Sequence, residues 1–443
     1  MKVLVSAYAC EPEKGSEPGV GWNWVKQIAR FHEVWVITRE NNRASIERSL
    51  GKDPIANLHF AYVDLPRWSR FWKKGARGVH LYYYLWQFAA YFTARNLNKS
   101  VQFDVGHHVT FVNDWSPSFL CLLPFPFVWG PVGGSTNRAP LGFWREFGLR
   151  GTIYEMVRTG AILIGRYLDP FVWFTRKKAG AIIAMSEAAV NGFPAASRNK
   201  VLPLGNVGFS LEELPKSSMA PFEPSENDES RIPIFLSAGR LVHWKGYSVL
   251  LKACAEVQRL GGRLELWIAG TGPDESRLRK LTSRLGIQDH VKFLGFLPDR
   301  ESVFDHLGRC DVFVMPTFHD GPPVIFLEAM AMGKPVICLD LGGASEIITP
   351  ECGVKLKALS VSQVIDDLAR AIQMLGENVE LRTKLGKAGR QRIETDFGWN
   401  KKGELVTDIY EGIVYREQHA VTADRVYATP DFAETNAHPG DGK

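Results

Sequence analysis

Two carboxylates, Asp320 and Glu328, stand eight positions apart in the stretch Asp-Gly-Pro-Pro-Val-Ile-Phe-Leu-Glu. An apolar run on each side of this stretch predicts a buried strand. The residues between the strands are expected to form a loop and then a short helix, whose first turn at Val324 and Ile325 offers free backbone N–H groups. Such a turn attracts anions. The stretch therefore predicts an anion pocket bracketed by two acids.

Two cations stand at the end of another predicted strand. Arg240 and Lys245 lie in Gly-Arg-Leu-Val-His-Trp-Lys-Gly, between the apolar run 234–238 and a helical pattern. A guanidinium is a planar fork and an ammonium is a point charge, so the two can converge on a diphosphate. An isolated Arg and Lys are usually surface charges, but a strand end favours binding. Gly270, in Ile-Ala-Gly-Thr-Gly-Pro, follows a further strand, and this G-x-G alone also suits a dehydrogenase.

The first half of the chain holds two more candidate motifs. Gly19 and Gly21 stand at the mouth of a helix after the first strand, where backbone N–H groups can approach a phosphate or a sugar. The same glycines fit a tight turn with tryptophans packed beneath it, and both interpretations stay open. His107 and His108 are neighbours at a predicted strand end, so their side chains point to opposite faces. A buried, satisfied histidine is the default, and at most one is expected to reach a cleft.

Composition and charge disfavour several classes of protein. With 45% hydrophobic and 23% charged residues the chain has the composition of a soluble globular protein, and a net charge of +5 over 443 residues does not argue for nucleic acid. The six cysteines have no C-x-x-C spacing, which predicts neither disulfides nor a zinc site and fits a reducing cytoplasm. The N-terminus enters a strand at once, so we expect no signal peptide. No uncharged apolar run approaches the roughly 20 residues that span a bilayer.

The elements that must position these residues follow an α/β pattern. Short apolar runs alternate with longer helical patterns in both halves, which predicts two Rossmann-like domains with ligands at the carboxyl ends of their strands. A stretch rich in Pro, Ser and acids divides the halves. The expected organisation is an N-terminal Rossmann-like domain at 1–210, a linker at 211–231, a C-terminal Rossmann-like domain at 232–398, a last helix at 399–416 and a disordered tail at 417–443. The predicted strands are 2–8, 34–38, 57–63, 105–109, 127–129, 181–185, 234–238, 264–269, 291–293, 311–315 and 335–339.

Two segments of the first domain combine cations with aromatic rings. Residues 65–103 contain no acid, and residues 140–178 have a similar composition. Rings that seat at lipid headgroups and cations that meet anionic lipid are typical of an interfacial membrane helix. The alternative is that the rings are core and the cations form a solvated face, and we favour membrane contact. Single-stranded nucleic acid binding uses the same composition, but no RNA-binding signature accompanies it.

Four motifs of the second half form a set: Gly-Arg-Leu-x5-Gly, Ile-Ala-Gly-Thr-Gly-Pro, Val-Lys-Phe-Leu-Gly-Phe and Asp-Gly-Pro-Pro-x4-Glu-Ala-Met-Ala-x-Gly-Lys-Pro-Val-Ile. Together they resemble the retaining group-1 (family 4) glycosyltransferases with the GT-B fold. The resemblance covers nearly the whole chain and is most specific at 239–353, while Ser-Glu-Pro-Gly-Val-Gly-Trp-Asn-Trp looks like a bacterial polysaccharide-type branch. It implies an α/β chain of two Rossmann-like domains that face each other across a cleft, with the last helix crossing back onto the first domain.

The resemblance also implies a role for each candidate residue. Arg240 and Lys245 would clamp the donor diphosphate, and Glu328 would bind the ribose hydroxyls. Asp320 stands where the family usually has Glu, before Pro-Pro in place of the common Phe-Gly, and would meet the transferred sugar. The family's first-domain histidine would correspond to His108. The implied nucleotide-sugar contacts are Gly19, Gly21, Arg240, Lys245, Gly270, Phe296, Leu297, Gly321, Val324, Ile325 and Glu328.

Backbone at Phe296 and Leu297 would contact the base, and the N–H groups of Val324 and Ile325 would meet the phosphate. No Asp-x-Asp pair occurs in the chain, and sugar-nucleotide sites that neutralise the diphosphate with a metal commonly need one. Helix N-termini and the two cations supply the positive charge here. A site without metal or cofactor is therefore expected.

The implied reaction moves a sugar from a UDP- or GDP-linked donor to an acceptor hydroxyl, with retention at the anomeric carbon. The basic, aromatic first domain favours a lipid-linked saccharide acceptor at the cytoplasmic face of the inner membrane, as in bacterial surface polysaccharide assembly. A sugar phosphorylase and a non-catalytic nucleotide-sugar-binding protein of the same fold are the alternatives. A nicotinamide dehydrogenase is disfavoured, because no acid follows the Gly270 turn by about 20 residues in the right strand context. The sequence does not name the base, sugar, acceptor, linkage or oligomeric state.

Overall fold

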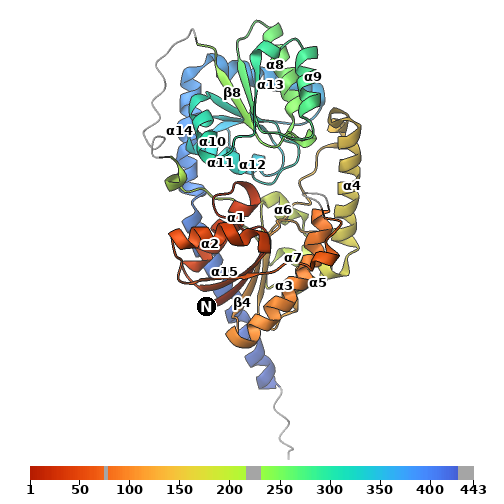
Figure 1. Ribbon diagram of the computed structural model, residues 1–443, viewed down its shortest axis with the longest axis vertical. Coiled ribbons are helices and arrows are strands. Elements are labelled where there is room, and N and C mark those ends of the chain that lie inside the picture. The colour runs from red at the N-terminus through yellow and green to blue at the C-terminus, as the bar shows by residue number, and fades with distance from the viewer. Residues whose placement is uncertain (74–77, 216–230, 428–443) are drawn as a thin grey trace, which may run out of the picture.

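The computed structural model describes residues 1–73, 78–215 and 231–427. These residues form two α/β domains stacked along the long axis of the molecule, with the N-terminal domain below the C-terminal domain in Figure 1. Most of the predicted linker, 216–230, and the end of the predicted tail, 428–443, lie outside the described residues.

A seven-stranded parallel sheet forms the centre of the N-terminal domain, in the order β3-β2-β1-β4-β5-β6-β7. The strand order reverses between β1 and β4, which is where open α/β sheets leave a crevice for ligands. Its strands are β1 Lys2–Ala7, β2 Glu33–Thr38, β3 Leu58–Tyr62, β4 Val105–Thr110, β5 Phe127–Val132, β6 Ala181–Ala184 and β7 Val201–Pro203.

The C-terminal domain contains a six-stranded parallel sheet in the order β10-β9-β8-β11-β12-β13. Its order reverses between β8 and β11. The strands are β8 Ile234–Ala238, β9 Glu265–Ala269, β10 Val291–Gly295, β11 Val312–Met315, β12 Val336–Leu339 and β13 Gly353–Leu356. The central strands are buried on both faces, as expected of a sheet covered by helices on each side.

Helices connect the parallel strands, and several begin at side-chain caps. Asp169 accepts the N–H groups of Phe171 and Val172 at the start of α5, and Asp299 accepts that of Ser302 at the start of α10. The helices of the N-terminal domain are α1 Ser16–Ala29, α2 Arg43–Lys52, α3 Val79–Val101, α4 Gly148–Tyr167, α5 Pro170–Lys178, α6 Glu187–Gly192 and α7 Ala195–Arg198. Those after β8 are α8 Tyr247–Arg259, α9 Glu275–Arg284, α10 Arg300–Arg309, α11 Val324–Ala331, α12 Ala344–Ile347, α13 Val361–Glu377, α14 Val379–Asp396 and α15 Trp399–Tyr427.

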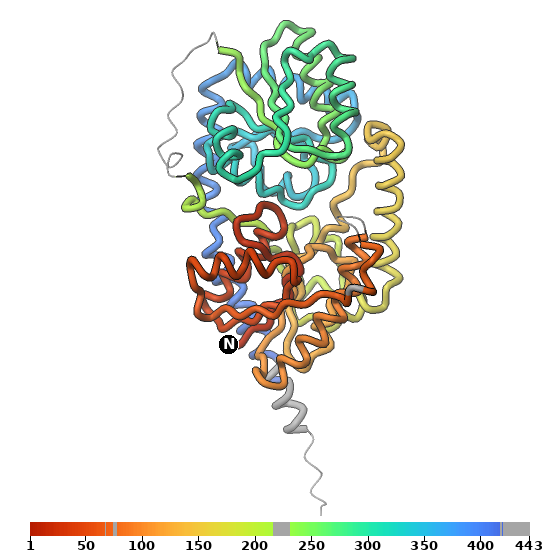
Figure 2. The backbone as a smooth tube through the Cα atoms, viewed as in Figure 1, coloured from red at the N-terminus to blue at the C-terminus, as the bar shows by residue number. Residues whose placement is uncertain are grey.

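The last helix returns to the first domain. After α14 ends beside the C-terminal sheet, α15 runs down along the N-terminal domain, as the blue end of the tube in Figure 2 shows. The Trp399 ring lies edge-on to Trp24 of α1, with centroids 6.2 Å apart. The predicted fold, two Rossmann-like sheets with a crossover helix, is confirmed. The helix continues to Tyr427, past the expected end at residue 416, so residues 417–427 are helical and not part of a disordered tail.

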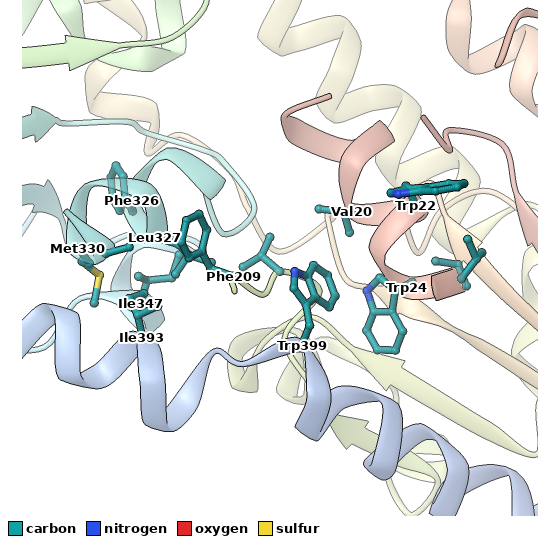
Figure 3. Packing of buried hydrophobic residues seen from close by; sticks show 14 of the residues in the cluster. Val20, Trp22, Trp24, Phe209, Phe326, Leu327, Met330, Ile347, Ile393 and Trp399 are labelled. Carbon is teal, nitrogen blue, oxygen red and sulfur yellow. The ribbon is translucent and has the colours of Figure 1, made fainter. Parts of the chain in front are cut away.

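Hydrophobic packing joins the two domains. One cluster runs from Trp24 in α1 through Phe209 and Trp399 to Leu327 of α11 and Ile393 of α14 (Figure 3). No helix among the described residues is both long and apolar enough to cross a bilayer.

The segment before α4 packs on the domain opposite to the one expected from its sequence position. Phe143 and Phe147 precede α4, yet their rings pack against Phe318, which follows β11, at centroid distances of 4.8 and 5.5 Å. The segment before α4 therefore belongs physically to the C-terminal core, although its sequence position lies within the predicted first domain.

Candidate functional site

The structure brings Lys245 and Asp320 together. Lys245 follows β8 and Asp320 follows β11, and these strands are neighbours at the reversal of strand order. Lys245 Nζ lies 2.9 Å from Asp320 Oδ2, and both side chains are partly exposed, at 16% and 19%. The pair thus stands at the carboxyl edge of the sheet, where ligands bind in this class of fold.

The two strand-end loops that carry this pair are bonded to each other. Phe318 donates its N–H to the carbonyl of Trp244 at 2.8 Å, and the Thr317 hydroxyl donates to the Asp320 carboxylate. On the other side, Gly343 donates its N–H to the Asp320 carbonyl at 3.0 Å. These bonds fix the position of Asp320 relative to the loop that bears Lys245.

Helix α11 begins four residues after Asp320, and its N-cap is Pro323. The N–H groups of Val324 and Ile325 are in its first turn, where a helix has no acceptors of its own. Gly321 lies against the other domain, because a Cβ at this position would stand 2.6 Å from Met185 Cε. The pocket predicted between the two acids is therefore bordered by the N-terminal domain.

Glu328 belongs to a separate ionic network. It is buried in α11, and its Oε1 accepts from Arg300 Nε at 3.0 Å, while Arg300 Nη1 donates to Glu213 Oε2 at 2.6 Å. Burial raises the pKa of Glu328, although Arg300 opposes this. Burial acts to lower the pKa of Arg300, but the two carboxylates outweigh it and raise the pKa. The ribose contact implied for Glu328 stays a prediction.

The other predicted donor contacts occupy the neighbouring strand ends. Arg240 is exposed directly after β8, and Phe296 is 71% exposed after β10, with Leu297 partly buried beside it. Gly270 has φ +125°, and a Cβ there would lie 2.0 Å from the Gly239 carbonyl oxygen. The two strand-end turns thus pack backbone against backbone, which requires glycine.

Both histidines of the first domain are buried. His107 lies between the Tyr410 hydroxyl, 2.5 Å from Nδ1, and the Gly130 carbonyl, 2.7 Å from Nε2. His108 Nε2 lies 2.7 Å from the Tyr83 hydroxyl. Burial lowers the pKa of His107 to about 4 and that of His108 to about 3, so both rings are uncharged at neutral pH. Neither joins the Lys245–Asp320 pair, and the role implied for His108 stays a prediction.

Gly19 and Gly21 lie in α1, where the loop that precedes the helix packs against them. A Cβ at Gly19 would lie 1.8 Å from the Lys14 carbonyl oxygen, and one at Gly21 would lie 2.0 Å from that of Ala9. Trp24 is buried below and donates its Nε1–H to the carbonyl of Asn206 at 2.9 Å. Both glycines thus lie in the first turns of α1, not in a turn before it, and the close approach of the Lys14 and Ala9 carbonyls explains why they are glycine. Their approach to a ligand stays a prediction.

Three residues near the site were not predicted from the sequence: Glu155, His243 and His319. Their possible ligand atoms all lie within 4.8 Å of one another, so these side chains have the chemistry to bind a divalent cation. His243 stands inside the motif that carries Lys245, and His319 directly precedes the motif that begins with Asp320. Glu155 could have been noticed as the single acid of α4.

Comparison with known proteins gives the family of the C-terminal half. Residues 221–392 match the model of glycosyl transferases group 1. The GDP-mannose-dependent monoacylated alpha-(1-6)-phosphatidylinositol monomannoside mannosyltransferase of Corynebacterium glutamicum is 33% identical over 186 residues, which are 40% of this chain and 47% of that protein. The lipopolysaccharide core biosynthesis glycosyltransferase LpsD of Rhizobium meliloti is 31% identical over 40% of this chain and 48% of its own length. The chain spans about half the length of the curated relatives it matches.

Solved structures cover nearly the whole chain at low identity and show the fold alone. Anabaena Alr3699/HepE in complex with UDP has a TM-score of 0.59 at 16% identity and covers 93% of this chain and 100% of its own. Sucrose-phosphate synthase from Thermosynechococcus elongatus has a TM-score of 0.60 at 18% identity, covering 95% and 99%. The family resemblance expected from the motifs is confirmed for this segment: residues 221–392 match the group 1 glycosyl transferases, and the chain has the GT-B fold.

Proposed function

We propose that this chain transfers a sugar from a nucleoside diphosphate sugar, linked to UDP or GDP, to an acceptor hydroxyl with retention at the anomeric carbon. The observation that carries the proposal is the Lys245–Asp320 pair at the reversal of strand order, within the matched segment. Relatives and solved neighbours support a nucleotide-sugar donor, since one relative is named for GDP-mannose and one neighbour was solved with UDP.

The pair suggests how the donor is handled. Lys245 is held by Asp320 in this structure, and a donor diphosphate would take over the ammonium. That exchange would free the Asp320 carboxylate for hydroxyl groups of the transferred sugar. Arg240 and the first turn of α11 add positive potential for the departing diphosphate, so positioning and electrostatic stabilisation would carry most of the rate. A phosphate oxygen of the donor can take the acceptor proton on the same face, which needs no paired general base and no metal.

The first test is a screen of UDP- and GDP-sugars for transfer or hydrolysis, followed by Lys245→Ala and Glu328→Ala. Loss of a charge that stabilises the leaving group should lower turnover by roughly 100- to 1000-fold. Glu328→Ala should mainly raise the KM for the donor. Lys280→Ala, an exposed lysine of α9, is the control and should keep wild-type rates. Near-normal kcat/KM in both site variants would contradict the proposal; turnover of a sugar phosphate without nucleotide would instead indicate a phosphorylase.

We also propose that the acceptor is a lipid-linked saccharide, reached at an anionic membrane surface of the cytoplasmic side. The support is the reversed polarity of α4. Its buried residues include Glu155 and Arg166, whereas its outward face is apolar, with Leu149 78% and Val157 68% exposed. The exposed apolar residues of α4 and its C-cap are Leu149, Ile153, Tyr154, Met156, Val157, Leu163, Ile164, Tyr167 and Leu168.

Basic and aromatic residues flank this apolar face. Trp173 of α5 is 55% exposed, and the Lys177 ammonium lies 5.0 Å from its ring centroid. Arg150 is exposed at the other end of α4. An apolar stripe flanked by tryptophan and cations is the pattern of a helix that lies in the lipid interface. It supports contact with a membrane that carries the acceptor.

A further inference from the structure

Glu155 connects the N-terminal domain to the two loops that carry Lys245 and Asp320. These loops, residues 240–247 and 316–323, are called the donor loops. It lies on α4, is 1% exposed, and its Oε1 accepts from His243 Nε2 at 3.0 Å and from His319 Nε2 at 2.7 Å. Both distances are those of well-formed hydrogen bonds. One carboxylate oxygen of the first domain thus holds two rings of the second domain.

Each of these rings lies close to a donor-site residue in the chain. His243 opens the short 3₁₀ helix His243–Lys245, and His319 directly precedes Asp320. The Trp244 ring contacts both: it lies edge-on to His243 with centroids 4.8 Å apart and is stacked on His319 with centroids 5.0 Å apart. It is also stacked on Tyr154 of α4 with centroids 5.5 Å apart. A shift of the Glu155 carboxylate would therefore move both loops of the Lys245–Asp320 pair.

The far end of α4 is fixed within the N-terminal domain. Arg166 is buried, donates to Asp114 Oδ2 at 2.8 Å and also bonds to the Ser135 hydroxyl and the Gly192 carbonyl. In Figure 1 α4 runs from this anchor up the side of the molecule to the C-terminal domain. The helix is thus attached at both ends and can transmit a change in domain arrangement to the donor loops.

The Glu155 carboxyl stays ionised. Burial acts to raise its pKa, but the bonds from His243 and His319 and the charge of Arg158 lower the pKa to about 2. Arg158 Nη1 lies 3.9 Å from Glu155 Oε2. The same guanidinium disfavours a divalent cation, which would face a positive charge. The observed hydrogen bonds already satisfy Glu155 Oε1.

We propose that Glu155 is a positioning residue for the donor site: through His243 and His319 it sets the geometry of Lys245 and Asp320. The donor site is then complete only when α4 is seated against the C-terminal domain. This inference rests on the proposed function for its kinetic consequence, but the loop positions that it concerns exist without catalysis. Glu155 itself need not touch the substrate.

The variants are Glu155→Ala, Glu155→Gln and, as a matched control, Glu146→Ala. Glu146 is a second carboxylate that forms an ion pair between the domains, with Lys252 Nζ at 2.7 Å. Among the described residues, its side chain bonds to Lys252 and its carbonyl accepts from Arg277, away from the loops of Lys245 and Asp320. Glu155→Ala should lower kcat by roughly 100-fold, the scale of a misplaced catalytic group, while the donor KM changes less than threefold. Glu155→Gln keeps an acceptor oxygen, so its kcat should be at least tenfold higher than that of Glu155→Ala. Equal kcat in Glu155→Ala and Glu146→Ala would reduce Glu155 to a structural contact and overturn the proposal.

Hydrogen exchange of the same proteins separates this inference from the proposed function. Amides of residues 240–247 and 316–323 should exchange faster in Glu155→Ala than in the wild type. In Glu146→Ala their exchange rates should be those of the wild type. Unchanged protection of both loops in Glu155→Ala would overturn the proposal, even if the wild-type protein transfers no sugar from any donor. Metal analysis of the purified protein completes the test: stoichiometric Zn²⁺ whose chelation reproduces the Glu155→Ala effects would replace the hydrogen-bonded arrangement with a metal site.

Discussion

The Glu17 carboxyl lies in the first turn of α1, where its Oε1 accepts the N–H of Val112 at 2.9 Å. Burial raises the pKa of Glu17 to about 7, and the bond from Val112 opposes the shift without cancelling it. The folded protein therefore keeps a proton between pH 4.5 and 7 that the unfolded chain has released. The stability contributed by this group is fully present below pH 4.5 and is lost as the pH rises to about 7.

Glu17→Gln removes this titration and keeps an oxygen that can accept from Val112. We expect the variant to gain stability relative to the wild type as the pH rises from 5 to 8, because only the wild type must bury a charge at the higher pH. Urea unfolding of both proteins at intervals of one pH unit measures the difference. Glu13→Gln changes an exposed carboxyl of the loop that precedes α1 and serves as the control. A stability difference that is independent of pH would show that Glu17 titrates normally.

At the residue scale, the sequence indicated candidate site residues where a charged side chain follows a predicted strand. Lys245 and Asp320 were predicted because each follows an apolar run inside a motif, and the sheet places them side by side. Glu155 could not be paired with His243, because 88 positions and a domain boundary separate them. For the adjacent histidines, β4 is covered on both faces, so neither His107 nor His108 reaches solvent.

At the element scale, helix α4 shows that an apolar pattern alone does not decide which face of a helix is buried. Its sequence has the spacing of an amphipathic helix, and the usual expectation is that the apolar stripe faces the core. Here the inward face carries Gly151, Glu155 and Arg166, whose partners lie in both domains, so the apolar stripe is turned outward. Turning Arg166 outward would leave the buried Asp114 carboxylate without its partner, which is costly, so the buried pair fixes the orientation of the helix.

Charges placed on this stripe should abolish membrane binding without disturbing the donor site. For the double variant Val157→Glu/Ile164→Glu we expect loss of flotation with anionic liposomes, because the carboxylates oppose both insertion and anionic lipid. The wild type should float with anionic vesicles and less with neutral ones. Leu359→Glu, at a residue 77% exposed on the C-terminal domain, should behave like the wild type. If the double variant floats as the wild type does, this stripe makes no membrane contact.

The strands show which elements the hydrophobic pattern of the sequence can predict. Strands β11 and β12 coincide with uninterrupted apolar runs, because both faces of a parallel sheet are covered. The strands β7 and β13 were not predicted: they are short edge strands, and Pro203 in one and Lys355 in the other interrupt the apolar run. The last helix was predicted to end at Arg416, because the polar, aperiodic sequence after it indicated disorder, whereas α15 continues to Tyr427.

At the scale of the whole molecule, one helix connects the two domains after the sheets are complete. The Trp399 side chain stands at the start of α15, between Trp24 of the N-terminal domain and the Phe209 segment that leads to the C-terminal domain (Figure 3). A Cβ at Gly208 would lie 2.7 Å from the Trp399 ring, so the ring is enclosed closely. The same hydrophobic cluster includes residues of both sheets, which predicts that the domains unfold together.

Trp399→Ala should uncouple the domains. Truncation of a buried indole leaves a cavity and costs roughly 3–5 kcal/mol of stability, and this loss falls on the contact between domains. In calorimetry we expect one transition for the wild type and two for the variant, with the N-terminal domain melting first because α15 packs on it. Tyr415→Ala removes an aromatic ring that is 62% exposed on the same helix and should leave the single transition unchanged. One transition at an unshifted Tm in Trp399→Ala would mean that the remaining contacts, Glu155 among them, suffice to hold the two domains as one cooperative unit.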